Sequence, residues 1–170
     1  MDDPTRWLLG ARDGDATDAA AFIRATQADV WRLCAHLGDR ASADDLTQET
    51  YARAWRALPS FRGDASARTW LLSIARRVAA DAIRSSVRRR RLDALLPRVE
   101  RVADPASGVA ATALLDDLPV EQRTAFVVTQ LLGITYDEAA TVCGCPVGTI
   151  RSRVARARDT LVRLVEEASA

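Results

Sequence analysis

Apolar residues recur three and four positions apart along most of this sequence, and this spacing limits the fold more than any other feature. Residues spaced in this way share one face of an α-helix. Runs with the alternating pattern of β-strands are nearly absent, and alanine and leucine dominate the sequence. The pattern therefore predicts an all-α fold.

The segment from Arg88 to Ser107 interrupts the helical pattern. It begins with a run of arginines and contains Pro97 and Pro105, a composition typical of a flexible linker. All four tryptophans lie within the first 70 residues, before this segment. We therefore predict two small helical domains, residues 1–88 and 110–170, joined by a flexible linker over residues 89–109. Each is near the size at which a core alone gives little stability.

Capping and breaking residues set the predicted helix ends. Ser42 and Asp45 have the spacing of a capping box, and Pro59 disfavours a helix through the residue before it. In the first domain we expect helices over residues 5–14, 18–37, 43–58 and 66–87. In the second we expect helices over 110–116, 119–132, 135–143 and 147–165, with a turn at 144–146.

The end of the chain has the pattern of a helix-turn-helix motif, with a short helix, a turn containing Gly144 and a longer helix. Apolar residues in the longer helix recur at helical spacing and should face a core: Val147, Ile150, Val154, Ala157 and Leu161. The residues on its other side, or at its border, suit a DNA major groove: Thr149, Arg151, Ser152, Arg153 and Arg156. The alternative is a solvated charged face on a helical hairpin. The turn, the polarity and the basic bias together favour binding to duplex DNA.

The helix predicted over 43–58 carries an acidic ridge. Asp45 and Glu49 are four residues apart and share a face, and Gln48 lies close to them. This ridge could pair with arginines of a partner helix. The alternative is that acidic residues lie near a helix N-terminus because they interact favourably with the helix dipole, and spacing alone favours it.

The helix predicted over 66–87 combines one aromatic residue with several arginines. Arg76, Arg77, Asp81 and Arg84 lie largely away from its apolar stripe, where arginines can follow a phosphate backbone. Trp70 lies near the start of the helix, where an aromatic ring can stack on or support an unpaired base. The preceding loop of residues 61–65 is small and polar enough to admit such a base. The alternative, which pattern alone favours, is that Trp70 belongs to the core.

Composition narrows the class of protein. The formal net charge is only +1, but the basic residues, all of them arginines, are concentrated in segments such as 66–91 and 146–158. The three cysteines and the single histidine do not form the four clustered ligands that a structural zinc site needs. The sequence also has no catalytic set and no phosphate-binding glycine loop. We therefore expect no enzyme, no cofactor and no metal. No signal peptide opens the chain and no apolar run is long enough for a bilayer, so we expect a cytoplasmic protein with no membrane insertion.

Three segments resemble one known family: DDLTQETYARAW (44–55), FRGDASARTWLLSIARRVAADAIR (61–84) and LLGITYDEAATVCGCPVGTIRSRVARARD (131–159). They are similar to the extracytoplasmic-function (group 4) sigma factors of bacterial RNA polymerase. Their sequences most resemble the actinobacterial sigma C type. The resemblance covers nearly the whole chain. It implies a sigma-2 domain followed by a sigma-4 domain, and a factor that directs core RNA polymerase to promoters and promotes strand opening.

The resemblance also implies roles for particular residues. The surface for core polymerase, whose β′ clamp helices and β flap are the expected partners, would include Asp45, Gln48, Glu49 and Arg53. The part that opens and reads the −10 element as single-stranded DNA would include Phe61, Arg62, Gly63, Asp64, Ser66, Trp70, Arg76, Arg77, Asp81 and Arg84. The duplex −35 element would be read by Thr149, Arg151, Ser152, Arg153 and Arg156. An anti-sigma factor is a further partner that the family admits.

The chain departs from the family at Arg77, where members often carry asparagine, so the −10 base that is read stays open. Two other functions also stay open on the residues alone. A stand-alone helix-turn-helix repressor would leave the first domain unexplained. A helical adaptor that binds only proteins would leave the arginines of the last helix without a role.

Overall fold

The computed structural model describes residues 2–38, 40–93 and 114–168, and every regular element in these ranges is helical. The first part of the chain forms α1 (Asp3–Arg12), α2 (Ala16–Leu37), α3 (Ala43–Ala57) and α4 (Ala67–Asp93), with the 3₁₀ turns η1 (Arg40–Ser42) and η2 (Leu58–Ser60) on either side of α3. The second part forms α6 (Val120–Phe126), the π-helical segment η3 (Val127–Leu131), α7 (Tyr136–Cys143) and α8 (Val147–Ala168). The all-α prediction is confirmed.

The core of the first domain lies between α2 and α4, with α1 and α3 packed around it. Phe22, Leu33 and Leu71 are almost completely buried there. The tryptophans lie at the border of this core rather than at its centre, because Trp55 and Trp70 are only partly buried. Trp55 packs on Phe22 with ring centroids 6.1 Å apart, a separation typical of interacting aromatic pairs.

Local capping explains several helix ends and corrects one prediction. Ser42 makes no capping hydrogen bond with its side chain, because it belongs to η1 and already has helical backbone angles. A true capping box lies instead at the start of α7, where the Thr135 hydroxyl and the Glu138 carboxylate satisfy each other's backbone N–H groups. The helix α4 continues to Asp93, six residues beyond its predicted end.

The second domain contains the predicted helix-turn-helix. Gly144 ends α7 with φ of +64°, a left-handed conformation that favours glycine, and the chain then turns into α8. Ile150, Val154 and Ala157 are buried, as the spacing of apolar residues predicts. The predicted helix over 119–132 is present in two parts, α6 and the π-helical η3.

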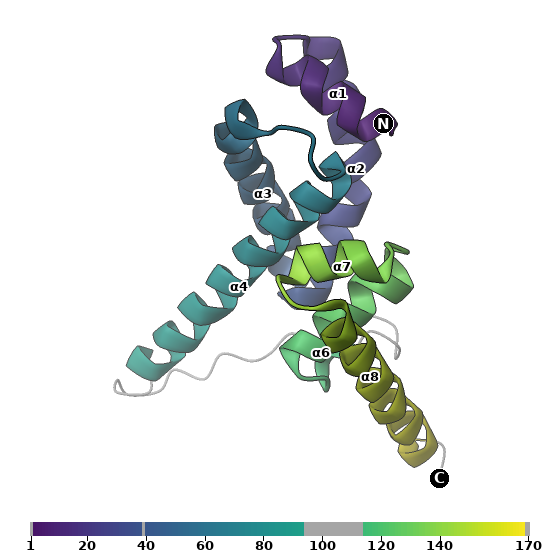
Figure 1. Ribbon diagram of the computed structural model, residues 1–170. Helices are drawn as coiled ribbons and strands as arrows, with labels where there is room; N and C mark the ends of the chain where they lie inside the picture. The colour runs from purple at the N-terminus through teal and green to yellow at the C-terminus, as the bar shows by residue number, and fades with distance from the viewer. Residues whose placement is uncertain (1, 39, 94–113, 169–170) are drawn as a thin grey trace.

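The second domain packs directly on the first. Figure 1 shows α7 lying across the middle of the first domain, while the ends of α4 and α8 extend away from the body in different directions. Helices α7 and α4 are in contact, and α6 contacts α2. Most of the predicted linker lies outside the described residues, so the domain boundaries at 88 and 110 stay predictions.

Candidate nucleic-acid interface

The loop between η2 and α4 borders a small cavity. Its volume is about 320 Å³, and it is lined by Ser60–Ala65 and by Trp70. Gly63 has φ of +79°, so the loop makes a turn there that side chains other than glycine rarely allow. The volume lies at the lower end of the range for pockets that hold small organic ligands. The loop and Trp70 therefore form a site that suits a planar group such as a base.

Phe61 lines this site but contributes little exposed surface. Its side chain is only 5% exposed, and its ring lies 5.0 Å from the Trp70 ring, centroid to centroid. Arg62 and Asp64 are exposed in the loop. Ser66 caps α4, since its hydroxyl accepts the Thr69 backbone N–H at 3.2 Å. Of the predicted loop residues, Arg62 and Asp64 are thus the ones free to meet a ligand directly, and Phe61 and Ser66 shape the loop.

One face of α4 continues away from the cavity. Arg77, Asp81 and Arg84 follow Trp70 by seven, eleven and fourteen residues, a spacing that puts all four on the same side of a helix. Arg77 and Arg84 are exposed, and Arg84 is paired with Asp81. This face presents two guanidinium groups in line with the cavity, an arrangement suited to a single strand whose base occupies the loop.

Arg76 lies on a different side of α4 and is engaged by the second domain. Its Nε donates to the Val142 carbonyl at the end of α7 at 2.8 Å. The sequence places Arg76 away from the apolar stripe but does not show that α7 covers it. In this arrangement Arg76 joins the two domains instead of facing solvent.

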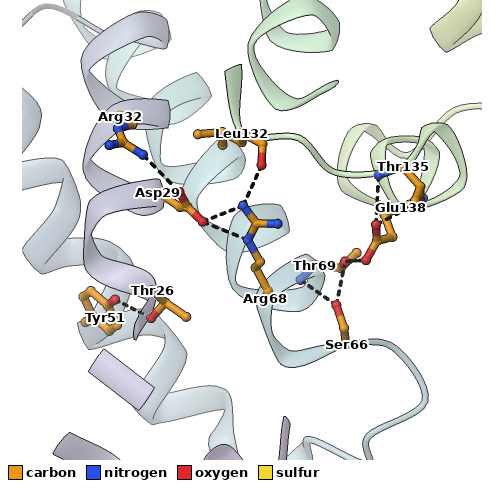
Figure 2. Close-up of polar contacts among 10 residues, drawn as sticks. All are labelled: Thr26, Asp29, Arg32, Tyr51, Ser66, Arg68, Thr69, Leu132, Thr135 and Glu138. Carbon is orange, nitrogen blue, oxygen red and sulfur yellow. Dashed lines mark hydrogen bonds and ion pairs between the residues drawn. The ribbon is translucent and has the colours of Figure 1, made fainter. Parts of the chain in front are cut away.

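Two further contacts between the domains lie at the start of α4 (Figure 2). Arg68 donates to the Leu132 carbonyl at 2.6 Å and pairs with Asp29 of α2 at 2.6 Å. The Thr69 hydroxyl donates to Glu138 at 3.2 Å. The sequence pattern gives Arg68 and Thr69 no particular role. Their contacts span more than 60 residues of sequence, and helical periodicity carries no signal of such pairs.

The acidic ridge of α3 is linked to α4 by an arginine. Arg53 donates to Glu49 and to Asp81, each at 2.7 Å. Hydrogen bonding to Arg53 holds the pKa of both carboxyl groups below its usual value. Asp45 and Gln48 are exposed on the same helix. The four residues predicted to bind core polymerase therefore lie on one helix, and two of them are also paired with each other.

The polar side of α8 is exposed as the sequence predicts. Arg151, Ser152 and Arg156 are exposed, while Thr149 and Arg153 are partly buried. The Arg153 guanidinium lies 3.5 Å from the Cys145 sulfur, at the turn that precedes α8. This side of α8 has the polar and basic character of a helix that enters a major groove.

The cysteines show the character of packed residues. Burial raises the pKa of the Cys34 thiol and of the Cys143 thiol to about 11. Over the described residues, no group of histidine, cysteine and acidic side chains is arranged to hold a metal ion. Within the same ranges, no helix has the length and apolar character needed to span a membrane.

Comparison with known proteins agrees with this geometry. Residues 22–90 match the family model for Sigma-70 region 2, and residues 109–161 match the model for Sigma-70, region 4. The cavity loop, the face of α4 and the acidic ridge of α3 fall within the first match. The helix-turn-helix falls within the second.

Individual relatives are also named as sigma factors. The chain is 53% identical to the ECF RNA polymerase sigma factor SigC of Mycobacterium tuberculosis, over 93% of this chain and 89% of that protein. It is 32% identical to the ECF RNA polymerase sigma-E factor of Escherichia coli, over 65% of this chain and 67% of that protein. Among solved structures, a complex of the sigma factor RpoE with the anti-sigma factor NepR from Bartonella quintana matches with a TM-score of 0.75 and 28% identity, covering 89% of this chain and 98% of the other. The chain therefore belongs to the extracytoplasmic-function group of the sigma-70 family, the factors that direct RNA polymerase to promoters.

Proposed function

We propose that the chain opens promoter DNA by capturing an unpaired −10 base in the cavity beside Trp70. The observation that carries this proposal is the alignment of the cavity of about 320 Å³ with Arg77 and Arg84 on one face of α4. A base in the cavity would meet the Trp70 ring, and the following phosphates would meet the two arginines. This is initiation by binding, without catalysis by this chain.

The energetics suit such a mechanism. Taking a base out of the duplex costs a few kcal/mol. Stacking on an aromatic ring returns roughly 1–3 kcal/mol per base, and phosphate contacts add to it. The sequence has no nucleotide-binding glycine loop that could supply energy from hydrolysis. Capture must therefore offset the cost of opening, and sequences that open easily, such as TA steps, should be favoured at −10.

The other two surfaces divide the remaining work. Asp45, Gln48 and Glu49 on α3 bind the β′ clamp helices of core polymerase through charge complementarity. Arg151 and Arg156, with the hydroxyl groups near them on α8, read the −35 duplex from the major groove. A sigma factor works where polymerase and chromosomal DNA meet, which in a bacterium is the cytoplasm. An anti-sigma factor is a further candidate partner, since the similar Bartonella quintana protein is found in complex with one.

The packing of the two domains also accounts for dependence on the polymerase. Arg68, Thr69 and Arg76 of α4 are bonded to the second domain, so that domain lies beside the −10 surface and is not placed to reach a separate −35 element. Core polymerase must separate the domains before both elements can be read. The free chain should therefore bind promoters poorly.

Run-off transcription tests the proposal. Purified core polymerase and this chain are given a pool of fragments from the source genome, and we expect discrete start sites. Asp45→Ala combined with Glu49→Ala should abolish these transcripts. Glu166→Ala combined with Glu167→Ala removes the same charge from exposed positions of α8 and serves as the matched control. Transcripts that survive the α3 changes, or a free chain that footprints promoters as well as the holoenzyme does, would contradict the proposal.

A further inference from the structure

The helix α1 lies against the loop of residues 61–66, with hydrogen bonds to Phe61 and to Ala67 just after the loop and with an apolar side chain near Gly63. The three residues that make these contacts are Thr5, Leu9 and Arg12, which are four and three positions apart and so share one face of α1. This helix precedes residues 22–90, the part of the chain that matches the region 2 model.

The first contact fixes the start of the loop. The Arg12 guanidinium donates to the Phe61 carbonyl at 3.0 Å, across 49 residues of sequence. The same group also donates to Asp13, which restrains its orientation. Because the Phe61 ring packs on Trp70, a hydrogen bond that fixes the Phe61 backbone also fixes the floor of the cavity. Hydrogen bonds with a charged donor are stronger than those between neutral groups.

The second contact fixes the end of the loop. The Thr5 hydroxyl accepts the Ala67 backbone N–H at 2.9 Å, and both residues are buried. Ala67 is the first residue of α4, where backbone N–H groups have no partner within the helix. Ser66 satisfies one of these groups from the loop itself. Thr5 satisfies another from α1, so the start of α4 is capped by two separate elements.

The third residue, Leu9, lies near the turn in the loop. A Cβ placed on Gly63 would lie 3.9 Å from Cδ1 of Leu9, so a side chain at this position would meet α1. The loop is thus held by hydrogen bonds at its start and just after its end, both from one face of a single helix. A loop fixed in this way keeps its shape before a base arrives, which lowers the entropy cost of binding.

We propose that α1 is a template that holds the base-capture loop in its binding shape, with Arg12 and Thr5 as positioning residues for −10 recognition. This inference rests on the proposed function, in which the loop captures a base. If the template is weakened, the loop should sample other shapes, and the cavity should discriminate less well between bases. Core binding and −35 binding should not change, because α1 lies on neither surface.

The decisive measurement is the base preference of the holoenzyme at the captured −10 position. Promoter fragments from the run-off assay are made with each of the four bases at that position, and open complexes are detected by permanganate reactivity. Arg12→Met keeps the apolar stem and removes the donors. Its matched control is Arg6→Met on the same helix, because Arg6 is exposed and pairs only within α1, with Asp3, among the contacts of the described residues.

We expect Arg12→Met to lower the preference for the best base over the others by up to about tenfold, the factor that corresponds to losing one charge-assisted hydrogen bond at the lower end of its range. Arg6→Met should behave as the unchanged protein does. The preference is a ratio, so a smaller folded fraction does not alter it. Thr5→Val should lower the ratio as well, whereas Thr5→Ser keeps the hydroxyl and should restore it. Equal ratios for Arg12→Met and Arg6→Met would overturn the inference.

A loop variant separates failure of the inference from failure of the proposed function. Arg62→Ala combined with Asp64→Ala changes the loop itself, at exposed positions. If this variant loses base preference and Arg12→Met does not, the loop captures the base and the template is wrong. If neither variant changes the preference, the loop is not the site of capture and both proposals fail.

Discussion

Replacing Arg68 by methionine should open the contact between the two domains. Arg68 joins them by donating to the Leu132 carbonyl at 2.6 Å while it pairs with Asp29 (Figure 2). Methionine keeps the length and apolar character of the stem but removes every donor. The change therefore removes one contact between the domains and leaves those of Thr69 and Arg76 in place.

The size of the effect follows from the contact that is lost. A hydrogen bond from a charged donor contributes about 1.5–3 kcal/mol. The Arg68 side chain is 32% exposed, so water competes for its donors and the lower end of the range applies. A loss of about 1.4 kcal/mol shifts an equilibrium tenfold. The open arrangement should thus become about tenfold more populated relative to the closed one.

Two measurements on the free chain test this shift. The radius of gyration from small-angle X-ray scattering should increase, because the domains separate. Affinity for a single-stranded −10 oligonucleotide should rise by up to the same tenfold factor, because the open arrangement releases Arg76 from the Val142 carbonyl and apparent affinity scales with the population that is competent to bind. Loss of a positive charge alone would weaken binding to DNA, so the expected increase has the opposite sign to the simple charge effect.

Arg32 provides the matched control. It pairs with the same Asp29 carboxylate at 3.6 Å but makes no hydrogen bond or ion pair with the second domain among the described residues. Asp29 is only 16% exposed, so losing either arginine also costs some stability in the first domain. Both variants are therefore compared well below their melting temperatures. If Arg68→Met and Arg32→Met give the same scattering and the same affinity, the contact at Leu132 does not hold the chain closed.

Three further predictions concern the second domain and the cysteines. Gly144→Ala should lower the melting temperature by several degrees, because a side chain in the left-handed region costs about 1 kcal/mol, whereas Gly148→Ala within α8 should raise it slightly. Glu138→Ala should also lower it by a few degrees at pH 7. The capping hydrogen bonds depress the pKa of this carboxyl below its ordinary value of 4.5. Its contribution to the stability of the folded chain is therefore complete above pH 4.5 and is lost as the pH falls through the lower pKa of the folded state. A difference in melting temperature between the two proteins that persists unchanged at pH 2 would contradict this. Burial raises the pKa of Cys34 and Cys143 to about 11, so iodoacetamide at pH 8 should alkylate them roughly 100-fold more slowly in the native than in the unfolded chain, as followed by mass spectrometry; equally rapid labelling of both would contradict this.

Periodicity and turn chemistry were sufficient to predict most of the helices. Buried Ile150 and Val154 lie where apolar spacing places them, and the glycine turn at Gly144 separates the two helices of the motif as expected. These features depend on residues close together in the sequence. The same is true of the exposed arginines of α8, which share a helix with the residues that bury its other face.

The features that sequence reasoning missed depend on contacts between distant segments. A helical pattern shows that Arg76 avoids the apolar stripe. It does not show whether the side chain then faces water or, as the structure has it, the end of α7. The bridge from Arg53 to Asp81 joins two helices across 28 residues. The Ser42 prediction was wrong because capping-box spacing says nothing about backbone angles, and η1 gives Ser42 helical ones. The genuine box at Thr135 and Glu138 has the same spacing and could have been found.

The surfaces left exposed in the closed arrangement suggest an order of events. Asp45 and Gln48 on α3 are exposed while α7 occupies Arg76, so core polymerase can bind the first domain before the second one leaves. The hydrogen bonds between the domains are few, and they end on carbonyl and carboxylate groups that water can satisfy once they separate. We therefore expect binding to the polymerase to open the chain. The loop proposed to capture the base, in contrast, is fixed by contacts within the first domain, from Thr5 and Arg12. Separation of the domains should then release Arg76 beside a loop that is already shaped, so that the energy of capture goes to opening the DNA rather than to ordering the loop.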